Sequence, residues 1–123
     1  MVLGLVEPES SGIGGGAFLL HWSEHDKTLR SYDGRETAPA AASKDRFLNE
    51  KGIPQDFIRA VLGGRSVGVP GVLRMLELAH QRHGILPWQE LFEPAIRLAE
   101  NGFATSPRLR LELEGERLLP DDP

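Results

Sequence analysis

A glycine-dense run at residues 12–16 constrains this chain more than any other feature, because four glycines in five positions stand directly ahead of a short apolar segment. Glycine adopts φ > 0 readily and lets the backbone lie close against another surface. The apolar segment 17–22 has the length of a buried strand, and the alternating residues 28–33 follow it after a polar turn. We therefore expect a β-hairpin entered through a loop that makes close backbone contacts.

A single arginine, Arg35, follows this hairpin within the segment 33–39. Its guanidinium offers donors in a planar fork that matches a carboxylate. An isolated arginine in a loop is ordinarily solvated, and the spacing alone leaves that interpretation open. The alternative is that the glycine run and Arg35 form one wall of a pocket for a small acidic molecule. Arg35 is therefore the candidate substrate-binding residue.

Helical signals dominate the second half of the chain. Apolar residues recur at helical spacing from Pro70, a favourable first helical residue, to a stop at Gly84. A second pattern begins at Pro87 and contains Pro94, which predicts a kink or two short helices. Ser106 precedes a proline and predicts a capped third helix. Shorter elements are expected at 2–6 (a strand or the last turn of a helix), 45–48 (a helical turn), 56–62 (a helix) and 65–69 (a strand). The order, β-rich and then α-rich, predicts an α+β fold.

Composition limits the class of protein. A length of 123 residues and a hydrophobic content of 40% fit one globular domain at most. The net charge of −4 gives no general attraction to nucleic acid or to an anionic membrane. Cysteine is absent, which excludes disulfides, zinc-thiolate sites and cysteine nucleophiles. No apolar run is long enough to cross a bilayer, and the sequence shows no signal-peptide pattern. Both ends look abrupt, so we expect a piece of a larger protein.

The glycines also satisfy a dinucleotide-binding fingerprint, G-x-G-x-x-G/A, from Gly12 to Ala17, and Asp33 follows at a fitting distance. That fingerprint needs a helix that begins at the glycines, so that its N-terminus faces the pyrophosphate. The segment 17–22 has strand length and is too short for the crossover helix of a βαβ unit. A nucleotide-binding module therefore remains an alternative that only a helix at 17–22 would support.

Two pairs of histidines have helical spacing. His21 and His25 lie four residues apart, but they fall in a strand and a turn, where the two rings do not share a face. His80 and His83 lie three apart at the end of a predicted helix, with no carboxylate at a fitting offset. We expect this second pair to face solvent near the helix C-terminus and not to bind a metal.

Three serines stand next to turn signals. Ser10 and Ser11 lack the flanking glycines of a nucleophile elbow, so turn and capping hydrogen bonds are the better interpretation. Ser66 follows two glycines and an arginine. That segment would either cradle an anion in a backbone nest or form a plain turn.

Five motifs occur in an order that resembles the γ-glutamyltranspeptidase family. They are Glu7-Pro-x-Ser-Ser-Gly-Ile-Gly-Gly-Gly16, Asp33-Gly-Arg-Glu-Thr-Ala-Pro39, Gly68-Val-Pro-Gly71, Leu86-Pro-Trp88 and Pro94-Ala-Ile-Arg-Leu-Ala-x-x-Gly-Phe103. The resemblance extends from about residue 2 to about residue 113, and it fits an early part of the large subunit of these enzymes.

The resemblance implies a fold, a chemistry and partners. Members of this family are glutathione hydrolases, N-terminal-nucleophile enzymes with a four-layer αββα sandwich, so this chain would be an incomplete sandwich. Their precursor is usually exported and cuts itself before a threonine, giving a large and a small subunit. The new N-terminal threonine attacks the γ-glutamyl amide of glutathione, and the γ-glutamyl group passes to water, an amino acid or a dipeptide. No metal or organic cofactor is implied.

The same resemblance assigns roles to residues. Arg35 matches the family arginine that grips the α-carboxylate of the γ-glutamyl group, and residues 36–38 would shape its loop. The glycine run would pack into the central sheet. Thr28, Thr37 and Thr105 are the threonines of this chain, and none matches the nucleophile. The nucleophile would therefore come from polypeptide outside this sequence, in the rest of the large subunit and the small subunit.

Three expectations follow for the chain by itself. We predict no turnover, since no internal threonine has the free α-amino group that serves as the base, and we predict poor stability. The alternative is a truncated, non-catalytic remnant that binds a partner or is degraded; a downstream reading frame with a processing-site threonine would favour the enzyme.

The expected division is a strand, glycine-loop and hairpin region at 1–39, a connector at 40–69 and a helical region at 70–123.

Overall fold

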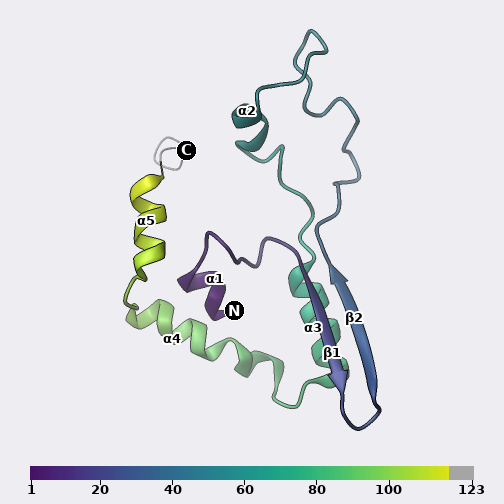
Figure 1. Ribbon diagram of the computed structural model, residues 1–123, viewed down its shortest axis with the longest axis vertical. Helices are drawn as coiled ribbons and strands as arrows, with labels where there is room; N and C mark the ends of the chain where they lie inside the picture. The colour runs from purple at the N-terminus through teal and green to yellow at the C-terminus, as the bar shows by residue number, and fades with distance from the viewer. Residues whose placement is uncertain (117–123) are drawn as a thin grey trace.

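The computed structural model describes residues 1–116. A β-hairpin and the helix α3 (Val72–His83) lie side by side, and a long connector that carries the short helix α2 (Phe57–Val61) extends away from them (Figure 1). The remaining helices are α1 (Val2–Val6), the 3₁₀ helix η1 (Trp88–Leu91), α4 (Glu93–Asn101) and α5 (Pro107–Gly115). The part of the predicted helical region from 117 to 123 lies outside the described residues.

The predicted hairpin is present. Strand β1 (Ala17–Ser23) pairs antiparallel with β2 (Thr28–Gly34), in a register that sets Ala17 opposite Gly34 and Ser23 opposite Thr28. The turn between them is closed by the Ser23 hydroxyl, which donates to Asp26 at 2.9 Å. Because β1 is a strand, no helix begins at the glycine run, and the geometry that a dinucleotide-binding module needs is not formed there.

One face of the hairpin packs against α3. Tyr32, Met75 and Ala79 form the buried centre of this contact. The partly buried side chains around them are Ala17, Leu19, Val72 and Leu76. Successive side chains of a strand point to opposite faces of the sheet, so the other face of β1 carries the exposed residues Phe18, Leu20 and Trp22. The described chain therefore builds one helix layer and part of one sheet, with the second face of that sheet still apolar and uncovered.

Helix α3 begins two residues later than predicted, at Val72 and not at Pro70. The amides of Gly71 and Val72 both donate to the Gly15 carbonyl at 3.2 Å, so the backbone before the helix is hydrogen-bonded to the glycine run. The strand predicted at 65–69 is likewise wrong. Val69 alone pairs, in an isolated bridge with Thr37. The helix ends as predicted at Gly84.

The connector is built from short turns. The Asn49 side chain accepts from the amides of Lys51 and Ile53, at 2.9 and 3.0 Å, and closes the turn there. Helix α2 falls within the predicted segment 56–62, and Gly63, with φ at +77°, follows it. A left-handed backbone of this kind is a position that favours glycine.

Of the two alternatives predicted at Pro94, a kink or two short helices, the structure shows two short helices. Pro94 lies in the first turn of α4, directly after the 3₁₀ helix η1, where its missing amide costs no hydrogen bond. Ser106 caps α5, with its hydroxyl accepting from the Leu109 amide at 3.0 Å. The segment 2–6, left open as strand or helix, is the helix α1, and it contacts α4. Within the described residues, no helix combines the length and the apolar character that crossing a membrane requires.

Candidate functional site

Three segments from different parts of the chain meet around Arg35. They are the end of the glycine run, the segment that follows β2, and the residues that precede α3. The Asp33 carboxylate accepts from the Arg35 amide at 2.9 Å, which fixes the backbone where β2 ends. Thr37 pairs with Val69, with N–O distances of 3.2 and 2.8 Å, and this bridge joins the second segment to the third.

Glycine is required at these contacts because the backbones touch. A Cβ at position 16 would lie 2.7 Å from the Arg35 Cα and 2.7 Å from the Gly34 carbonyl oxygen. A Cβ at position 71 would lie 2.6 Å from the same oxygen. Real Cβ atoms do not approach other atoms so closely. Gly16, the last glycine of the run, thus serves close approach, whereas a Cβ at Gly12 would meet its nearest atom at 4.0 Å and one at Gly14 would meet nothing within 4 Å.

The run does not adopt the left-handed backbone that its composition also allows. The glycines with positive φ are Gly52, Gly63 and Gly102 among the described residues, and all three lie in other loops. Close packing alone therefore accounts for the glycines that contact Arg35.

The Arg35 guanidinium is held by two groups from its own neighbourhood. Its Nη1 donates to the Gly16 carbonyl at 3.2 Å, and its Nη2 lies 3.1 Å from the Glu36 carboxylate. The Arg35 side chain is 53% exposed and the Glu36 side chain 31% exposed. An ion pair at this exposure contributes little stability, about 0–1 kcal/mol. Its effect is to orient the fork while other N–H groups remain available to a ligand.

The three residues that follow Arg35 in the chain, Glu36, Thr37 and Ala38, line a cavity of about 480 Å³. Its far wall is formed by the connector, including Arg46 and Arg65. The Arg46 side chain donates to the carbonyl oxygens of Gly64 and Arg65, so it ties this wall together. The motif that contains Arg35 thus lies at the edge of a hollow and not on a flat surface.

Ser10, Ser11 and Ser66, the serines next to turn signals, take part in turns. The amides of Ser10 and Ser11 both donate to the Glu7 carbonyl at 3.1 Å, and the Ser10 hydroxyl accepts from Arg108. The Ser66 hydroxyl lies within hydrogen-bond distance of the carbonyl oxygens of Val61 and Gly63. These contacts match the plain-turn interpretation.

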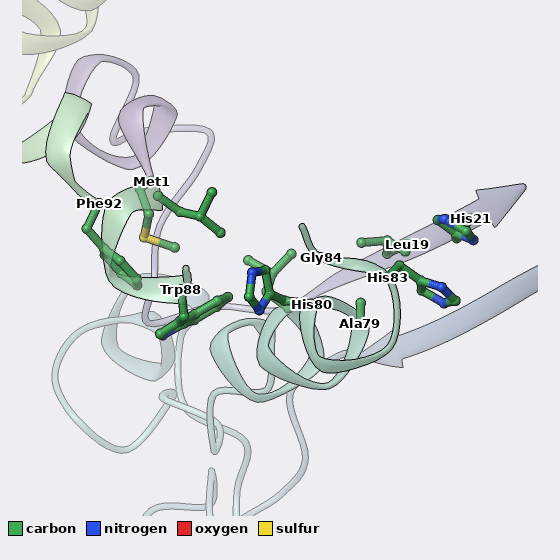
Figure 2. Close-up of a pocket in the computed structure, with 11 residues that line it drawn as sticks. Met1, Leu19, His21, Ala79, His80, His83, Gly84, Trp88 and Phe92 are labelled. Atoms are coloured by element: carbon green, nitrogen blue, oxygen red, sulfur yellow. The ribbon is translucent and has the colours of Figure 1, made fainter. Parts of the chain in front are cut away.

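The prediction of solvent-facing histidines at the end of α3 is wrong. His83 is half-buried, stacks on His21 and contacts the Tyr32 hydroxyl. His80 is also half-buried; its Nε2 lies 2.7 Å from the Leu86 carbonyl oxygen and its ring lies beside Trp88 (Figure 2). Helical spacing did not reveal these contacts, because the partners come from β1, from β2, and from the loop and the 3₁₀ helix η1 that follow α3.

A family model described as gamma-glutamyltranspeptidase matches residues 1–123. The chain belongs to the γ-glutamyltranspeptidase family. It is 49% identical over 109 residues to glutathione hydrolase 3 of Arabidopsis thaliana, covering 89% of this chain and 16% of the relative. It is 43% identical to Scoloptoxin SSD14 of Scolopendra dehaani, covering 95% of this chain and 19% of the relative.

The fold agrees with that assignment. The chain is similar to the γ-glutamyltranspeptidase of Pseudomonas nitroreducens complexed with L-DON, with a TM-score of 0.84 and 37% identity over 93% of this chain and 33% of that chain. The described residues are therefore a mixed α and β portion of an N-terminal-nucleophile fold. The chain spans about a fifth of the length of the curated relatives that it matches.

Proposed function

We propose that this chain is the part of a glutathione hydrolase that binds the α-carboxylate of the γ-glutamyl group, through Arg35. The complete enzyme would cleave the γ-glutamyl amide of glutathione and transfer the γ-glutamyl group to water, an amino acid or a peptide. Membership of the family and the names of the relatives support this assignment. The single observation that carries it is the guanidinium of Arg35, which is oriented between the Gly16 carbonyl and Glu36 and is half-exposed, so that its remaining N–H groups are open to a ligand.

The chemistry assigns a positioning task to Arg35. A planar guanidinium holds a carboxylate through two parallel hydrogen bonds, which fixes both its place and its direction. A γ-glutamyl donor held at its free acid end presents its amide carbon at a defined distance from that anchor. Glu36 orients the anchor and would not take part in the bond-breaking step.

The attacking group would belong to the remainder of the enzyme. An N-terminal threonine uses its own α-amino group as the base, and an internal threonine has none. Thr37 is engaged through its backbone in the bridge with Val69, and Thr28 opens β2. We therefore propose that the rest of the large subunit and a small subunit complete the site, with no metal or organic cofactor in the reaction and an exported enzyme as its setting.

The test compares two donors in the complete enzyme. One is a chromogenic γ-glutamyl anilide, and the other is the matching 4-aminobutyryl anilide, which lacks the α-carboxylate. We expect Arg35→Lys to lower kcat/KM for the first donor by about tenfold or more, equivalent to about 1.4 kcal/mol, because lysine keeps the charge but loses the fork. The second donor should be turned over slowly and equally by both proteins.

The matched control is Arg74→Lys. Arg74 is an exposed arginine of α3 that pairs with Glu77 at 2.7 Å. This control should keep the kinetics of the parent enzyme. Unchanged kcat/KM for the γ-glutamyl anilide in Arg35→Lys, or an equal loss for both donors, would remove the carboxylate-binding role.

A further inference from the structure

Two imidazoles from distant parts of the chain stack between the hairpin and α3. The ring centroids of His21, on β1, and His83, in the last turn of α3, lie 3.7 Å apart with an interplanar angle of 9°. Figure 2 shows the two rings next to each other where the strand passes the end of the helix. Parallel stacking at this distance leaves no room for water between the rings, so each ring forms part of the other's surroundings.

Hydrogen bonding ties this stack to the core. His83 Nε2 lies 2.6 Å from the Tyr32 hydroxyl, and Tyr32 is one of the buried residues that pack against α3. The His21 Nδ1 atom is buried and has no hydrogen-bond partner within the described part of the chain. A proton added at that atom would place a charge there without an acceptor to receive it.

The charged groups around the stack are mostly positive. The positive charges of Arg30 on β2 and Arg82 on α3 both lower the pKa of the His83 imidazole. The Arg82 guanidinium lies 5.8 Å from the centre of the Tyr32 ring. Asp26, in the turn of the hairpin, is the acidic group whose charge raises the pKa of the His83 imidazole. The Asp26 carboxylate is itself engaged by His25 at 2.9 Å and by the Ser23 hydroxyl. The surroundings therefore favour the neutral form of the His83 imidazole.

We propose that the His21–His83 stack is an acid-sensitive lock that holds the C-terminal turn of α3 against the hairpin. The lock is closed when both rings are neutral. It opens on protonation, because two imidazolium rings in face-to-face contact repel each other and the neighbouring arginines add to that repulsion.

The direction of the pH effect follows from His83. Burial lowers the pKa of the His83 imidazole below its ordinary value of about 6.5, and His21, Arg30 and Arg82 lower it further, while Asp26 acts in the opposite sense. The unfolded or opened segment therefore binds a proton more readily than the closed one. The stabilisation is fully present above pH 6.5 and is lost as the pH falls from there through the lower pKa of the closed form.

Opening should be local. The other end of α3 is held by the Gly71 and Val72 amides on the Gly15 carbonyl and by Met75 against Gly34, and it carries no histidine. An apolar cavity of about 390 Å³ is lined by His21, His80 and His83 together with Leu19, Leu76 and Trp88. Protonation would therefore loosen the last turn of α3 and widen this cavity while the contacts at Arg35 persist.

Hydrogen exchange of the complete enzyme tests the lock, because it reads the last turn of α3 independently of catalysis. The peptide of interest contains Gly84, whose amide donates to the His80 carbonyl at 2.6 Å. Exchange rates, divided by the intrinsic rate at each pH, are compared between pH 7.5 and pH 5.5. We expect this peptide to lose protection by at least about threefold at the lower pH, and a peptide covering 71–75 to keep its protection.

Two variants and one control complete the experiment. His21→Phe keeps a stacked ring and removes one titrating group, and His83→Gln keeps a polar partner for Tyr32 without a charge. Both should flatten the pH dependence. His25→Gln is the control, since His25 is 97% exposed on the turn and the glutamine amide keeps a donor for the Asp26 carboxylate; this variant should behave as the parent enzyme does. An unchanged pH dependence in both stack variants, or equal protection of the parent at the two pH values, would overturn the proposal.

Discussion

Substituting Gly71 with alanine tests whether glycine packing positions Arg35. A Cβ at this position would lie 2.6 Å from the Gly34 carbonyl oxygen and 2.8 Å from the Arg35 carbonyl oxygen. Ordinary contacts of a Cβ begin at 3.4 Å, so the first of these is too short by about 0.8 Å. Both atoms that the Cβ meets are backbone atoms, which cannot rotate away as a flexible side chain would.

The expected loss has two parts. Crowding of this kind in a packed site destabilises a protein by about 1–3 kcal/mol. The backbone of Gly34 and Arg35 must move by most of the 0.8 Å, and a misplacement of about 1 Å at a substrate anchor costs on the order of 100-fold in rate. We therefore expect Gly71→Ala in the complete enzyme to lower kcat/KM by about 10- to 100-fold and to lower the melting temperature.

The control is Gly14→Ala. A Cβ at Gly14 would meet nothing within 4 Å, and Gly14 has no positive φ, so alanine fits there. This variant should keep its activity and match or slightly exceed the parent in stability, because alanine restricts the unfolded chain more than glycine does. Thermal unfolding and anilide kinetics on the two variants decide the question. Equal behaviour of Gly71→Ala and Gly14→Ala would refute the argument that close packing sets the position of Arg35.

Two further predictions follow from the helix caps and from the uncovered sheet face. Ser106→Ala removes the side-chain cap of α5 and should lower the free energy of unfolding of the complete enzyme by about 1 kcal/mol. Ser106→Thr keeps a hydroxyl for the Leu109 amide and for the Glu7 carboxylate and should retain most of that free energy, as denaturant titration would reveal. The chain expressed alone should release no product from a γ-glutamyl anilide and should bind a hydrophobic dye through Phe18, Leu20 and Trp22. Release above a heat-treated control, or dye binding unchanged by Leu20→Ser, would contradict the second prediction.

The elements that local chemistry decides were predictable from the sequence. The hairpin follows from an apolar segment of strand length and an alternating segment on the two sides of a polar turn, and α5 follows from a serine cap with a proline behind it. The break before α4 follows from Pro94, whose ring excludes it from a helix interior. In each case the residues that carry the signal are neighbours in the sequence.

The errors arise where distant backbone decides the outcome. Pro70 would suit the first turn of a helix, but α3 begins only after the Gly71 and Val72 amides have bonded to the Gly15 carbonyl. The segment 65–69 has the composition of a strand, yet a single bridge at Val69 is formed. A five-residue apolar segment such as 2–6 is short enough to be a strand or a helix, and its contact with α4 selects the helix.

The candidate site shows the same division between local and distant information. The sequence indicated that the glycine run and Arg35 would lie together, and the Gly16 carbonyl does bind the guanidinium. The sequence did not indicate that Gly71 packs directly against the backbone of residues 34 and 35 at the start of α3, although Gly71 belongs to one of the five motifs. The stacked histidines gave no signal, since no periodicity relates a strand residue to the last turn of a later helix.

These contacts explain why three motifs that are separate in the sequence act as one structural unit. The position of Arg35 depends on backbone approaches at Gly16 and Gly71 that any side chain would block. Residues that share one displaced backbone do not lose free energy independently of each other. Once alanine at one of these glycines has moved the Gly34–Arg35 backbone, alanine at the other meets a contact that is already relaxed. The cost of the pair should therefore fall below the two single costs added together, and the three segments are better regarded as one binding element than as a loop with two supports.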